Sequence, residues 1–356
     1  MNIVEATASY ERWAASHLAL IKPDLAYKHS RMEQALFSFM RATFYRWVQL
    51  SREACPDLLD APSLLAVGDL HVENFGTWRD AEGRLVWGIN DFDEVARMPY
   101  TLDLVRLAAS AFLAIREGGL RIEPGQACAA ILSGYAGVLK NGPRGFVLEE
   151  DHADLRAMAL GADRDPKRFW KKMLKLKSCG PVPKEVRRLL ADALPAPRLT
   201  FKIVHRRAGL GSLGRPRYTA LAVWRDAMIA HEAKALLPSA YGWAIGRPAT
   251  ASLYGKLLDQ AIRTSDPFLT ARGSWVVRRL APHCSRIELS HLPRRRNERE
   301  LLEAMGAETA NLHSGTPEAI AAVRRDLRSR GTEWLGSAAR TMVVATESDW
   351  NRWRRR

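Results

Sequence analysis

The sequence predicts an α+β fold of two lobes, in which a small antiparallel β-sheet lobe is inserted in a mainly helical lobe. Three observations predict it. Apolar residues recur at helical spacing over residues 31–50, strand-like alternation begins at residue 201, and helical spacing returns from residue 300. We therefore expect three regions along the chain: a helical lobe over 1–198, a β-rich lobe over 199–292, and helices returning to the first lobe over 293–356.

Length and composition indicate a globular protein with a large core. The chain has 356 residues, 47% of them apolar, and 11 tryptophans. Its four cysteines are far apart and form no CxxC pair, so neither a disulfide framework nor a zinc site is expected. The N-terminus lacks a signal-peptide pattern, and the longest apolar run, residues 102–115, contains Asp103 and Arg106. We expect no membrane span and a cytoplasmic location.

The chain is strongly basic. Lysine and arginine outnumber aspartate and glutamate by 54 to 39, which gives a net charge of +15, and the excess is concentrated at residues 167–177, 293–299 and 350–356. Such charge favours anionic partners, namely nucleotides, phosphorylated metabolites or nucleic acid. A solvated, arginine-rich surface has the same composition, so charge alone does not name the substrate.

The helical lobe is predicted element by element. Residues 31–50 form one amphipathic helix whose core face carries Leu36, Phe39, Met40, Thr43, Trp47 and Leu50. Residues 64–67 and 85–89 are two short apolar strands, separated by a turn at residues 79–83. A buried helix follows over 101–116. The charged stretch 141–200 is interrupted by prolines, which predicts linkers at 181–185 and 194–198.

A group of polar residues lies at the ends of the two predicted strands. In GDLHVEN, residues 68–74, Asp69 precedes Asn74 by five positions, and Asp91 follows the second strand. Phosphoryl transfer needs a carboxylate that orients or accepts the proton of the nucleophile, and oxygen ligands that hold Mg²⁺ against the nucleotide phosphates. The protein-kinase catalytic loop has the same Asp-to-Asn spacing, and the metal-binding Asp of kinases also precedes a Phe. We therefore expect Asp69 to be catalytic and Asn74 and Asp91 to be metal ligands.

Neighbouring residues have further interpretations. His71 orients Asp69 or contacts a phosphate, or it is a hydrogen-bonded structural histidine. Asp93 ligates a second Mg²⁺, or it holds its loop through backbone amides. Asp103 and Arg106 stand one helical turn apart and are expected to pair beneath the site. His313 ends a helix, where a cationic side chain suits the helix dipole.

Two other interpretations suit parts of this group. The DLH sequence also suits a metallophosphoesterase in which Asp69 and His71 ligate a metal, but that chemistry needs further ligands from later strands, and no GNH-type partner follows. Isolated Asp and Asn residues also commonly cap turns. Five polar groups around two apolar strands make turn capping alone a weaker explanation.

The β-rich lobe contributes a glycine motif. GLGSLG contains Gly209, Gly211, Ser212 and Gly214, and the residues after it read as a strand rather than a helix. A strand, glycine loop and strand is the arrangement that covers ATP phosphates in kinases. Lys234 lies on the next predicted strand, where a lysine pairs with the α- and β-phosphates. We expect these residues to bind the nucleotide.

The order of the motifs is reversed relative to kinases, in which the glycine loop precedes the catalytic loop. Circular permutation explains this order. If residue 315 is joined to residue 60, the chain runs from glycine loop to lysine, to the strand at 274–281, to the helix at 300–313 and then to the catalytic loop. Permutation is tolerated when the packed core is unchanged. The predicted fold is therefore a two-lobed, circularly permuted, protein-kinase-like fold.

The sequence resembles the bacterial domain of unknown function 2252, a family similar to kinase-like and aminoglycoside-phosphotransferase-like folds. The most specific shared motifs are VGDLHVENFG at 67–76 and INDFDE at 89–94; others are RMEQALFSFMRATFYRW, DLVRLAAS, GLGSLG, EAKALLPS, SDPFL, WVVRRL and NLHSG. The resemblance implies a catalytic Asp69, metal ligands Asn74 and Asp91, and a nucleotide clamp formed by Gly209, Gly211, Gly214 and Lys234. This chain departs from kinases in having no glutamate between residues 235 and 287 to pair with Lys234, so Asp259 or Asp266 is expected to substitute.

The predicted function is ATP- and Mg²⁺-dependent phosphoryl transfer to a hydroxyl acceptor, preferably a small hydroxylated or anionic molecule. Nucleotidyl (AMP) transfer with the same residues is the nearest alternative. A catalytically inactive nucleotide- or nucleic-acid-binding protein is the alternative from another class, and the net charge and the missing glutamate favour it. Steep salt dependence of nucleic-acid binding would distinguish it.

Overall fold

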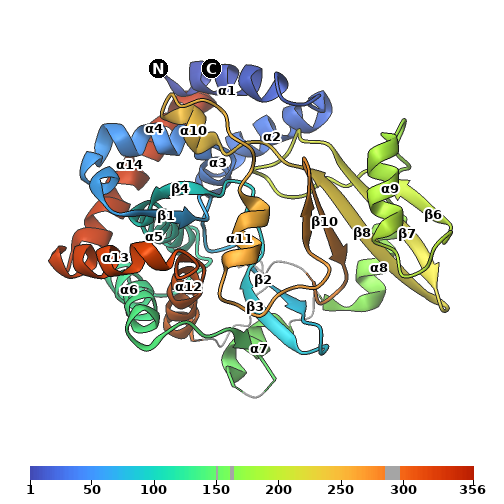
Figure 1. Ribbon diagram of the computed structural model, residues 1–356. Helices are drawn as coiled ribbons and strands as arrows, with labels where there is room; N and C mark the ends of the chain where they lie inside the picture. The colour runs from blue at the N-terminus through green and yellow to red at the C-terminus, as the bar shows by residue number, and fades with distance from the viewer. Residues whose placement is uncertain (150, 161–163, 285–296) are drawn as a thin grey trace.

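A computed structural model describes residues 1–149, 151–160, 164–284 and 297–356 of the chain (Figure 1). It is a mixed fold of helices and small antiparallel sheets, which confirms the predicted combination of elements. Residues 285–292 of the predicted β-rich lobe, and residues 293–296 of the basic cluster 293–299, lie outside the described residues. None of the described helices is long and apolar enough to cross a membrane.

Residues 1–54 contain four helices, and the predicted helix over 31–50 is divided among the last three of them. They are α1 (Ile3–Ala15), α2 (Lys22–Gln34), α3 (Leu36–Ala42) and α4 (Phe44–Ala54). The predicted continuous helix over 31–50 is wrong, because the backbone is extended at Ala35 and leaves helical geometry at Thr43. The hydroxyl of Thr43 donates to the Phe39 carbonyl at 2.8 Å and replaces the backbone amide there, which bends a helix. The predicted apolar face is nevertheless buried.

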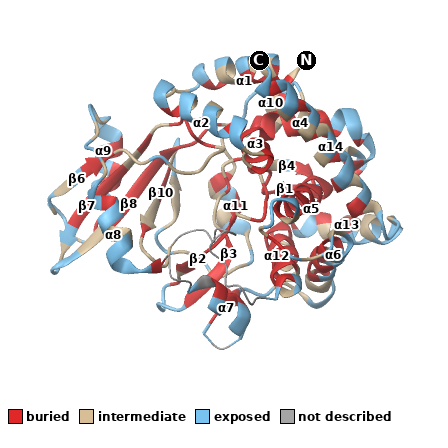
Figure 2. Ribbon diagram, turned by 180° about the vertical axis from the view of Figure 1, so that it is seen from behind, coloured by how far each residue is buried: buried red, intermediate tan, exposed pale blue. Residues whose placement is uncertain are grey.

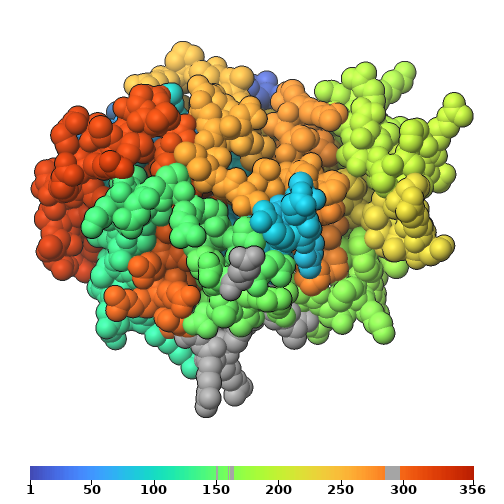
Figure 3. Space-filling model, turned by 60° about the horizontal axis from the view of Figure 1, so that its bottom comes forward, coloured from blue at the N-terminus to red at the C-terminus, as the bar shows by residue number. Residues whose placement is uncertain are grey.

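Two small sheets follow. After the 3₁₀-helix η1 (Pro56–Asp60), β1 (Ser63–Ala66) pairs with β4 (Ala96–Pro99). The hairpin turn predicted at 79–83 connects β2 (Phe75–Arg79) with β3 (Leu85–Ile89), and β5 (Phe146–Val147) completes that sheet. The strand at 64–67 is therefore not the hairpin partner of 85–89, and β2 went unrecognised in the sequence. The hairpin tip, drawn in cyan, reaches the surface beside the orange segment of the β-rich region (Figure 3).

The core of the helical part surrounds one buried helix, α5 (Tyr100–Arg116), as predicted for 101–116. Helices α6 (Pro124–Asn141), α12 (Glu298–His313), α13 (Pro317–Ser329) and α14 (Trp334–Arg354) complete this part, and α6 packs along α12. Buried residues concentrate on α5 and α12 and on the central strands (Figure 2). The helix predicted from residue 300 is thus confirmed.

The β-rich region contains a five-stranded antiparallel sheet. Its strand order is β6 (Phe201–Val204), β7 (Arg217–Trp224), β8 (Ala227–Ala235), β10 (Trp275–Leu280) and β9 (Thr270–Arg272). Helices α7 (Ala153–Ala159), α8 (Pro166–Leu174) and α9 (Lys184–Asp192) precede it, and α10 (Ala240–Ala244) and α11 (Tyr254–Gln260) stand between β8 and β9. The stretch 181–185 is only partly a linker, since α9 begins at Lys184.

Strand alternation gives the two faces of this sheet different partners. Val186, Leu189 and Leu190 of α9 pack on one face with Ile203, Ala220, Ala233 and Val277. Met173 of α8 packs on the opposite face with Val204, Leu221, Ala230 and Leu280. Because side chains alternate along a strand, Arg217, Glu232, Lys234 and Arg278 share the α8 face. That face looks toward the acidic loops of the helical part.

Candidate functional site

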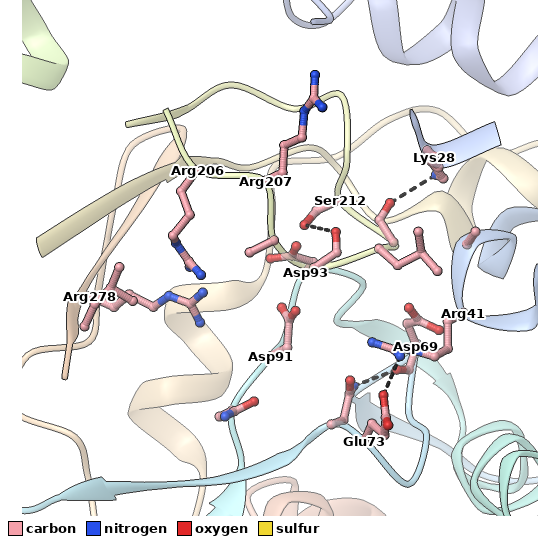
Figure 4. Close-up of a pocket in the computed structure, with 18 of the residues that line it drawn as sticks. Lys28, Arg41, Asp69, Glu73, Asp91, Asp93, Arg206, Arg207, Ser212 and Arg278 are labelled. Atoms are coloured by element: carbon pink, nitrogen blue, oxygen red, sulfur yellow. Dashed lines mark hydrogen bonds and ion pairs between the residues drawn. The ribbon is translucent and has the colours of Figure 1, made fainter. Parts of the chain in front are cut away.

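A cavity of about 920 Å³ lies between the acidic loops and the β-rich region (Figure 4). Its volume is within the range of small-molecule sites. Most residues predicted for the site line its wall, namely Asp69, His71, Asn74, Asp91, Asp93, Gly209, Gly211 and Ser212. Lys234 contacts the acidic residues from the sheet, and Gly214 lies at the far end of the glycine segment, where its carbonyl accepts a hydrogen bond from the Ile21 amide at 2.8 Å. The structure therefore brings both predicted halves together.

The loop that carries Asp69 is held from below by Asp103. The Asp103 carboxylate accepts hydrogen bonds from the amides of Val67, at 2.7 Å, and Gly68, at 2.8 Å. Gly68 has φ +89°, and a Cβ there would stand 2.3 Å from the Glu94 carbonyl oxygen, so this turn requires glycine. His313 Nε2 lies 3.0 Å from Asp103 Oδ2. The predicted helix-end role of His313 is thus corrected, because its ring is buried between Asp103 and Tyr135.

Asp69 is oriented through one of its two oxygens. Arg106 Nε donates to Asp69 Oδ1 at 2.8 Å, and Arg106 Nη2 donates to the Met40 carbonyl at 2.8 Å. The Arg106 guanidinium is buried and lies over the rings of Phe44 and Trp47. The expected pair of Asp103 with Arg106 is therefore wrong: on the buried helix α5 the two side chains hold different parts of the loop that carries Asp69.

Burial raises the pKa of Asp69 above its ordinary value, and the nearby Arg106 and Arg41 guanidinium groups oppose this shift only in part. The second oxygen, Oδ2, points toward the glycine segment, since a Cβ built on Gly211 would lie 3.1 Å from it. A carboxylate with one fixed oxygen, one oxygen toward a cavity and a raised pKa has the properties of a general base.

The rest of the GDLHVEN loop is ordered by local hydrogen bonds. Asn74 Nδ2 donates to the Asp69 carbonyl at 2.7 Å, which leaves the amide oxygen of Asn74 as an acceptor. His71 Nδ1 accepts a hydrogen bond from the Glu73 amide at 3.2 Å, so this ring nitrogen stabilises the loop conformation. Glu73, which sequence reasoning passed over, accepts from Arg41 Nη1 at 2.5 Å. All four side chains line the cavity.

Lys234 joins the sheet to the acidic segment. Its Nζ lies 2.5 Å from Asp93 Oδ1 and 3.2 Å from Asp91 Oδ1. Asp93 is therefore a partner of the lysine, and the expectation that Asp259 or Asp266 would substitute for the kinase glutamate is corrected. The Asp266 carboxylate instead accepts from the Phe268 amide at 3.0 Å.

Asp91 and Asp93 differ in exposure. The Asp91 side chain is 33% exposed and the Asp93 side chain only 10%. Burial acts to raise the pKa of Asp91, but the charges of Lys234, Arg278 and Arg217 outweigh it and hold this pKa well below its ordinary value. Asp91 is thus an ionised carboxylate that faces the cavity.

Glu232 forms ion pairs with three arginines near Asp91. Its carboxylate is fully buried and pairs with Arg206 at 2.7 Å, Arg217 at 2.5 Å and Arg278 at 3.0 Å. Burial acts to raise the pKa of Glu232, yet the three guanidinium groups bring it well below its ordinary value. Figure 4 shows Arg206 and Arg278 directed toward the space above Asp91. Because one carboxylate pairs with three guanidinium groups, this side of the cavity keeps a net positive charge.

The glycine segment connects β6 with β7, as predicted, and it is anchored at several points. Lys28 Nζ of α2 donates to the Gly211 carbonyl at 3.1 Å, and burial lowers the pKa of Lys28 to about 8. Arg215, just after Gly214, pairs with Glu94 at 2.6 Å. Arg217 Nη2 donates to Ser212 Oγ at 3.1 Å. The segment therefore lies over Asp69 in a defined position.

Several site residues were missed by sequence reasoning: Lys28, Arg41, Glu73, Glu94, Arg206, Arg215, Glu232 and Arg278. Glu232 and Arg278 had a usable pattern, because Glu232 stands two residues before Lys234 on its strand and so shares its face. Register then places Arg278 directly opposite Glu232 on β10. The partners of Lys28 and Arg215 lie far away in the chain, and no local pattern indicates them.

The oxygen donors on the cavity wall agree with what Mg²⁺ requires. Mg²⁺ is usually bound by one or two carboxylates together with substrate phosphates and waters. Asp91 and Asn74 offer an ionised carboxylate and an amide oxygen on the cavity wall. Among the described residues, no group of three or more His, Cys, Asp or Glu side chains is arranged to hold a metal by itself. The residues fit a magnesium ion that arrives with a nucleotide, and Asp93 is less suited as a ligand because Lys234 and Arg215 contact it.

The protein is thus of the mixed α and β class. At its cavity, carboxylates of the helical part contact lysine and arginine side chains of the β-rich region. Residues 20–174 match the family model of domain of unknown function 2252, described as an uncharacterized protein conserved in bacteria. The resemblance seen in the sequence is thereby confirmed over these residues, which include the GDLHVEN and NDFDE motifs. No curated protein and no solved structure matches the chain.

Proposed function

We propose that the protein is an ATP- and Mg²⁺-dependent phosphotransferase of the kinase-like type that acts on a hydroxyl group of a small molecule. One observation carries the proposal: Lys234 Nζ lies 3.2 Å from Asp91 Oδ1, beside a cavity that also contains Asp69 and the glycine segment. These residues are the parts that phosphoryl transfer uses for positioning and charge stabilisation.

Each residue has a role in the proposed reaction. Asp69 Oδ2 accepts the proton of the acceptor hydroxyl, whose oxygen forms a bond to the γ-phosphorus while the bond from that phosphorus to the bridging oxygen breaks and ADP leaves. Asp91 and Asn74 hold Mg²⁺, which neutralises charge on the phosphates when it is bound. In the described part of the chain the amides of Leu210 and Gly211 donate to no protein acceptor, so they are available to phosphate oxygens.

A circularly permuted kinase-like order is part of the proposal. The end of α12 lies next to the start of β1, since the Leu65 amide donates to Thr316 Oγ1 at 3.1 Å. Helix α12 and strand β1 are thus neighbours in space, as the permuted order requires. The strand order and the position of Lys234 opposite Asp91 support the same arrangement.

The test is transfer of label from γ-labelled ATP into a bacterial metabolite extract. We expect a labelled product with the wild type and a loss of about 10²–10⁴-fold with Asp69→Asn, because the general base is removed. Asp226→Asn, on the exposed turn between β7 and β8, is the matched control and should retain full activity. Equal labelling by wild type and Asp69→Asn would remove Asp69 from the mechanism.

A catalytically inactive nucleotide-binding protein is the second candidate, and nucleotidyl (AMP) transfer is a variant of the first. Lys234 is not among the residues that line the cavity and is held 2.5 Å from Asp93, which favours the inactive alternative because its ammonium group is less available to phosphates. Thermal stabilisation by ATP and Mg²⁺ without label transfer would support it. Transfer of label from α-labelled but not γ-labelled ATP would indicate nucleotidyl transfer instead.

A further inference from the structure

We propose that the acceptor is a small molecule that carries a phosphate group in addition to its reacting hydroxyl, and that Lys172, Lys175 and Lys177 bind this phosphate. The inference rests on the proposed function, because it identifies where in the same cavity the acceptor binds. All three lysines line the cavity, on or just after α8, away in the chain from both the glycine motif and the acidic loops.

The charge balance of the cavity wall indicates an anionic ligand. Ten lysine and arginine residues line the wall against five aspartate and glutamate residues. Each acidic residue already has a cationic partner: Arg106 for Asp69, Arg41 for Glu73, Lys234 for Asp91 and Asp93, and Arg215 for Glu94. The acidic residues therefore do not neutralise the remaining lysines. A second anionic group beside the nucleotide would do so.

The local structure of α8 presents these lysines to the cavity. Met173 packs on the sheet at the cavity wall, and Lys172, Lys175 and Lys177 beside it are exposed and line the same cavity. Residues just after α8 are fixed to β6, because the His205 amide donates to the Lys177 carbonyl at 3.1 Å and the Cys179 amide to the Ile203 carbonyl at 3.0 Å. In the described part of the chain, Lys172, Lys175 and Lys177 form no ion pair with a carboxylate, so their ammonium groups are available.

The size of the cavity favours a small molecule over a nucleic acid. A volume of about 920 Å³ suits a nucleotide with a second small ligand, whereas a polynucleotide needs a long open groove. A phosphate accepts charge-assisted hydrogen bonds from several lysines at once. Two other lysines of α8, Lys167 and Lys171, do not line the cavity, and they provide a matched comparison.

The experiment is isothermal titration of the full chain with glycerol 3-phosphate, after saturation with Mg²⁺ and a non-hydrolysable β,γ-imido analogue of ATP. Glycerol is the neutral counterpart, and inorganic phosphate tests the anion alone. We expect glycerol 3-phosphate and inorganic phosphate to bind, and glycerol to bind at least about tenfold more weakly. The double variant Lys172→Glu with Lys175→Glu should weaken phosphate binding at least about tenfold. The equally charged pair Lys167→Glu with Lys171→Glu should change it less than about twofold.

Three outcomes would overturn the inference. The first is that the saturated wild type binds no phosphate, and the second is that both double variants weaken phosphate binding equally. The third is that the protein binds a single-stranded oligonucleotide in a salt-dependent way but binds no phosphate, and that only the double variant at Lys172 and Lys175 abolishes oligonucleotide binding. Failure of the proposed function is seen separately, because the wild type would then transfer no label from γ-labelled ATP to any acceptor, whether or not the analogue with Mg²⁺ raises its melting temperature. Failure of the inference leaves label transfer intact.

Discussion

Asp93 Oδ1 lies 2.5 Å from Lys234 Nζ, and this contact joins the acidic segment to the central strand of the β-rich region. Both side chains are nearly inaccessible, at 10% and 3% exposure. Asp91 contacts the same ammonium group but keeps 33% of its side chain exposed toward the cavity. The two carboxylates therefore divide their work: Asp93 fixes the lysine, and Asp91 is available to a metal ion.

Asp93→Ala should lower the free energy of unfolding by about 3–5 kcal/mol, because it leaves a buried lysine with less compensating charge. Asp91→Ala should cost less stability, since that side chain is more exposed, but it should abolish the part of ATP-induced stabilisation that depends on Mg²⁺. Urea denaturation and melting temperatures with ATP, with and without Mg²⁺, measure both effects. The division is wrong if Asp93→Ala is as stable as wild type while Asp91→Ala is not.

The pH dependence of the reaction should follow the ionisation of Asp69. Because burial raises its pKa, the value of kcat/KM should increase with pH to a plateau, with a midpoint above the ordinary aspartate value of about 3.9. Arg106 lowers this pKa, so Arg106→Gln should move the midpoint to higher pH. The pH profile of Asp226→Asn serves as the control. A midpoint that stays in place without Arg106 would show that another group controls the rate.

Glu232→Gln should lower the free energy of unfolding by about 3–5 kcal/mol at pH 7, because Arg206, Arg217 and Arg278 lose their common carboxylate. The pKa of Glu232 is lower in the folded than in the unfolded chain, so this stabilisation is complete above about pH 4.5 and is lost as pH falls toward the folded value. Denaturation curves of wild type and variant should therefore converge in acid. Curves that remain parallel below pH 4.5 would contradict the assignment.

Local patterns in the sequence predicted much of the fold. The alternation in β7 and β10 and the helical spacing in α12 reflect which face of each element is buried, the apolar run of α5 reflects burial on all sides, and the structure confirms these elements. The helix over 31–50 was predicted too long because periodicity reports the buried face and not the continuity of the backbone. Thr43 occupies a position of the same apolar stripe, so the spacing gives no sign that its hydroxyl bends the chain there.

The candidate site was predictable where chemistry follows from short spacing, and not where it depends on distant contacts. Asp69, Asn74 and Asp91 share one loop and hairpin, so their proximity was evident in the sequence. The predicted partners of Lys234, Asp259 and Asp266, follow it in the chain, whereas the observed partner Asp93 precedes it by 141 residues. Such pairing is set by the packing of the sheet against the helical part, which no local pattern encodes.

A close approach between the glycine segment and the GDLHVEN loop gives a last prediction. A Cβ on Gly211 would stand 3.1 Å from Asp69 Oδ2 and 3.2 Å from the Arg41 carbonyl oxygen, so Gly211→Ala must shift the segment by a few tenths of an ångström. Phosphoryl transfer should fall by about tenfold or more, because small misplacements at reacting groups are costly. The unfolding free energy should change by less than about 1 kcal/mol, since Gly211 has no positive φ.

Gly137→Ala is the matched control for this substitution, because an added Cβ in the middle of α6 meets nothing within 4 Å. It should raise the unfolding free energy by up to about 1 kcal/mol through helix propensity and leave phosphoryl transfer unchanged. Steady-state rates and urea denaturation of both variants separate a positioning effect from a folding effect. Full activity of Gly211→Ala would mean that the glycine segment moves away from Asp69 before the phosphoryl group is transferred.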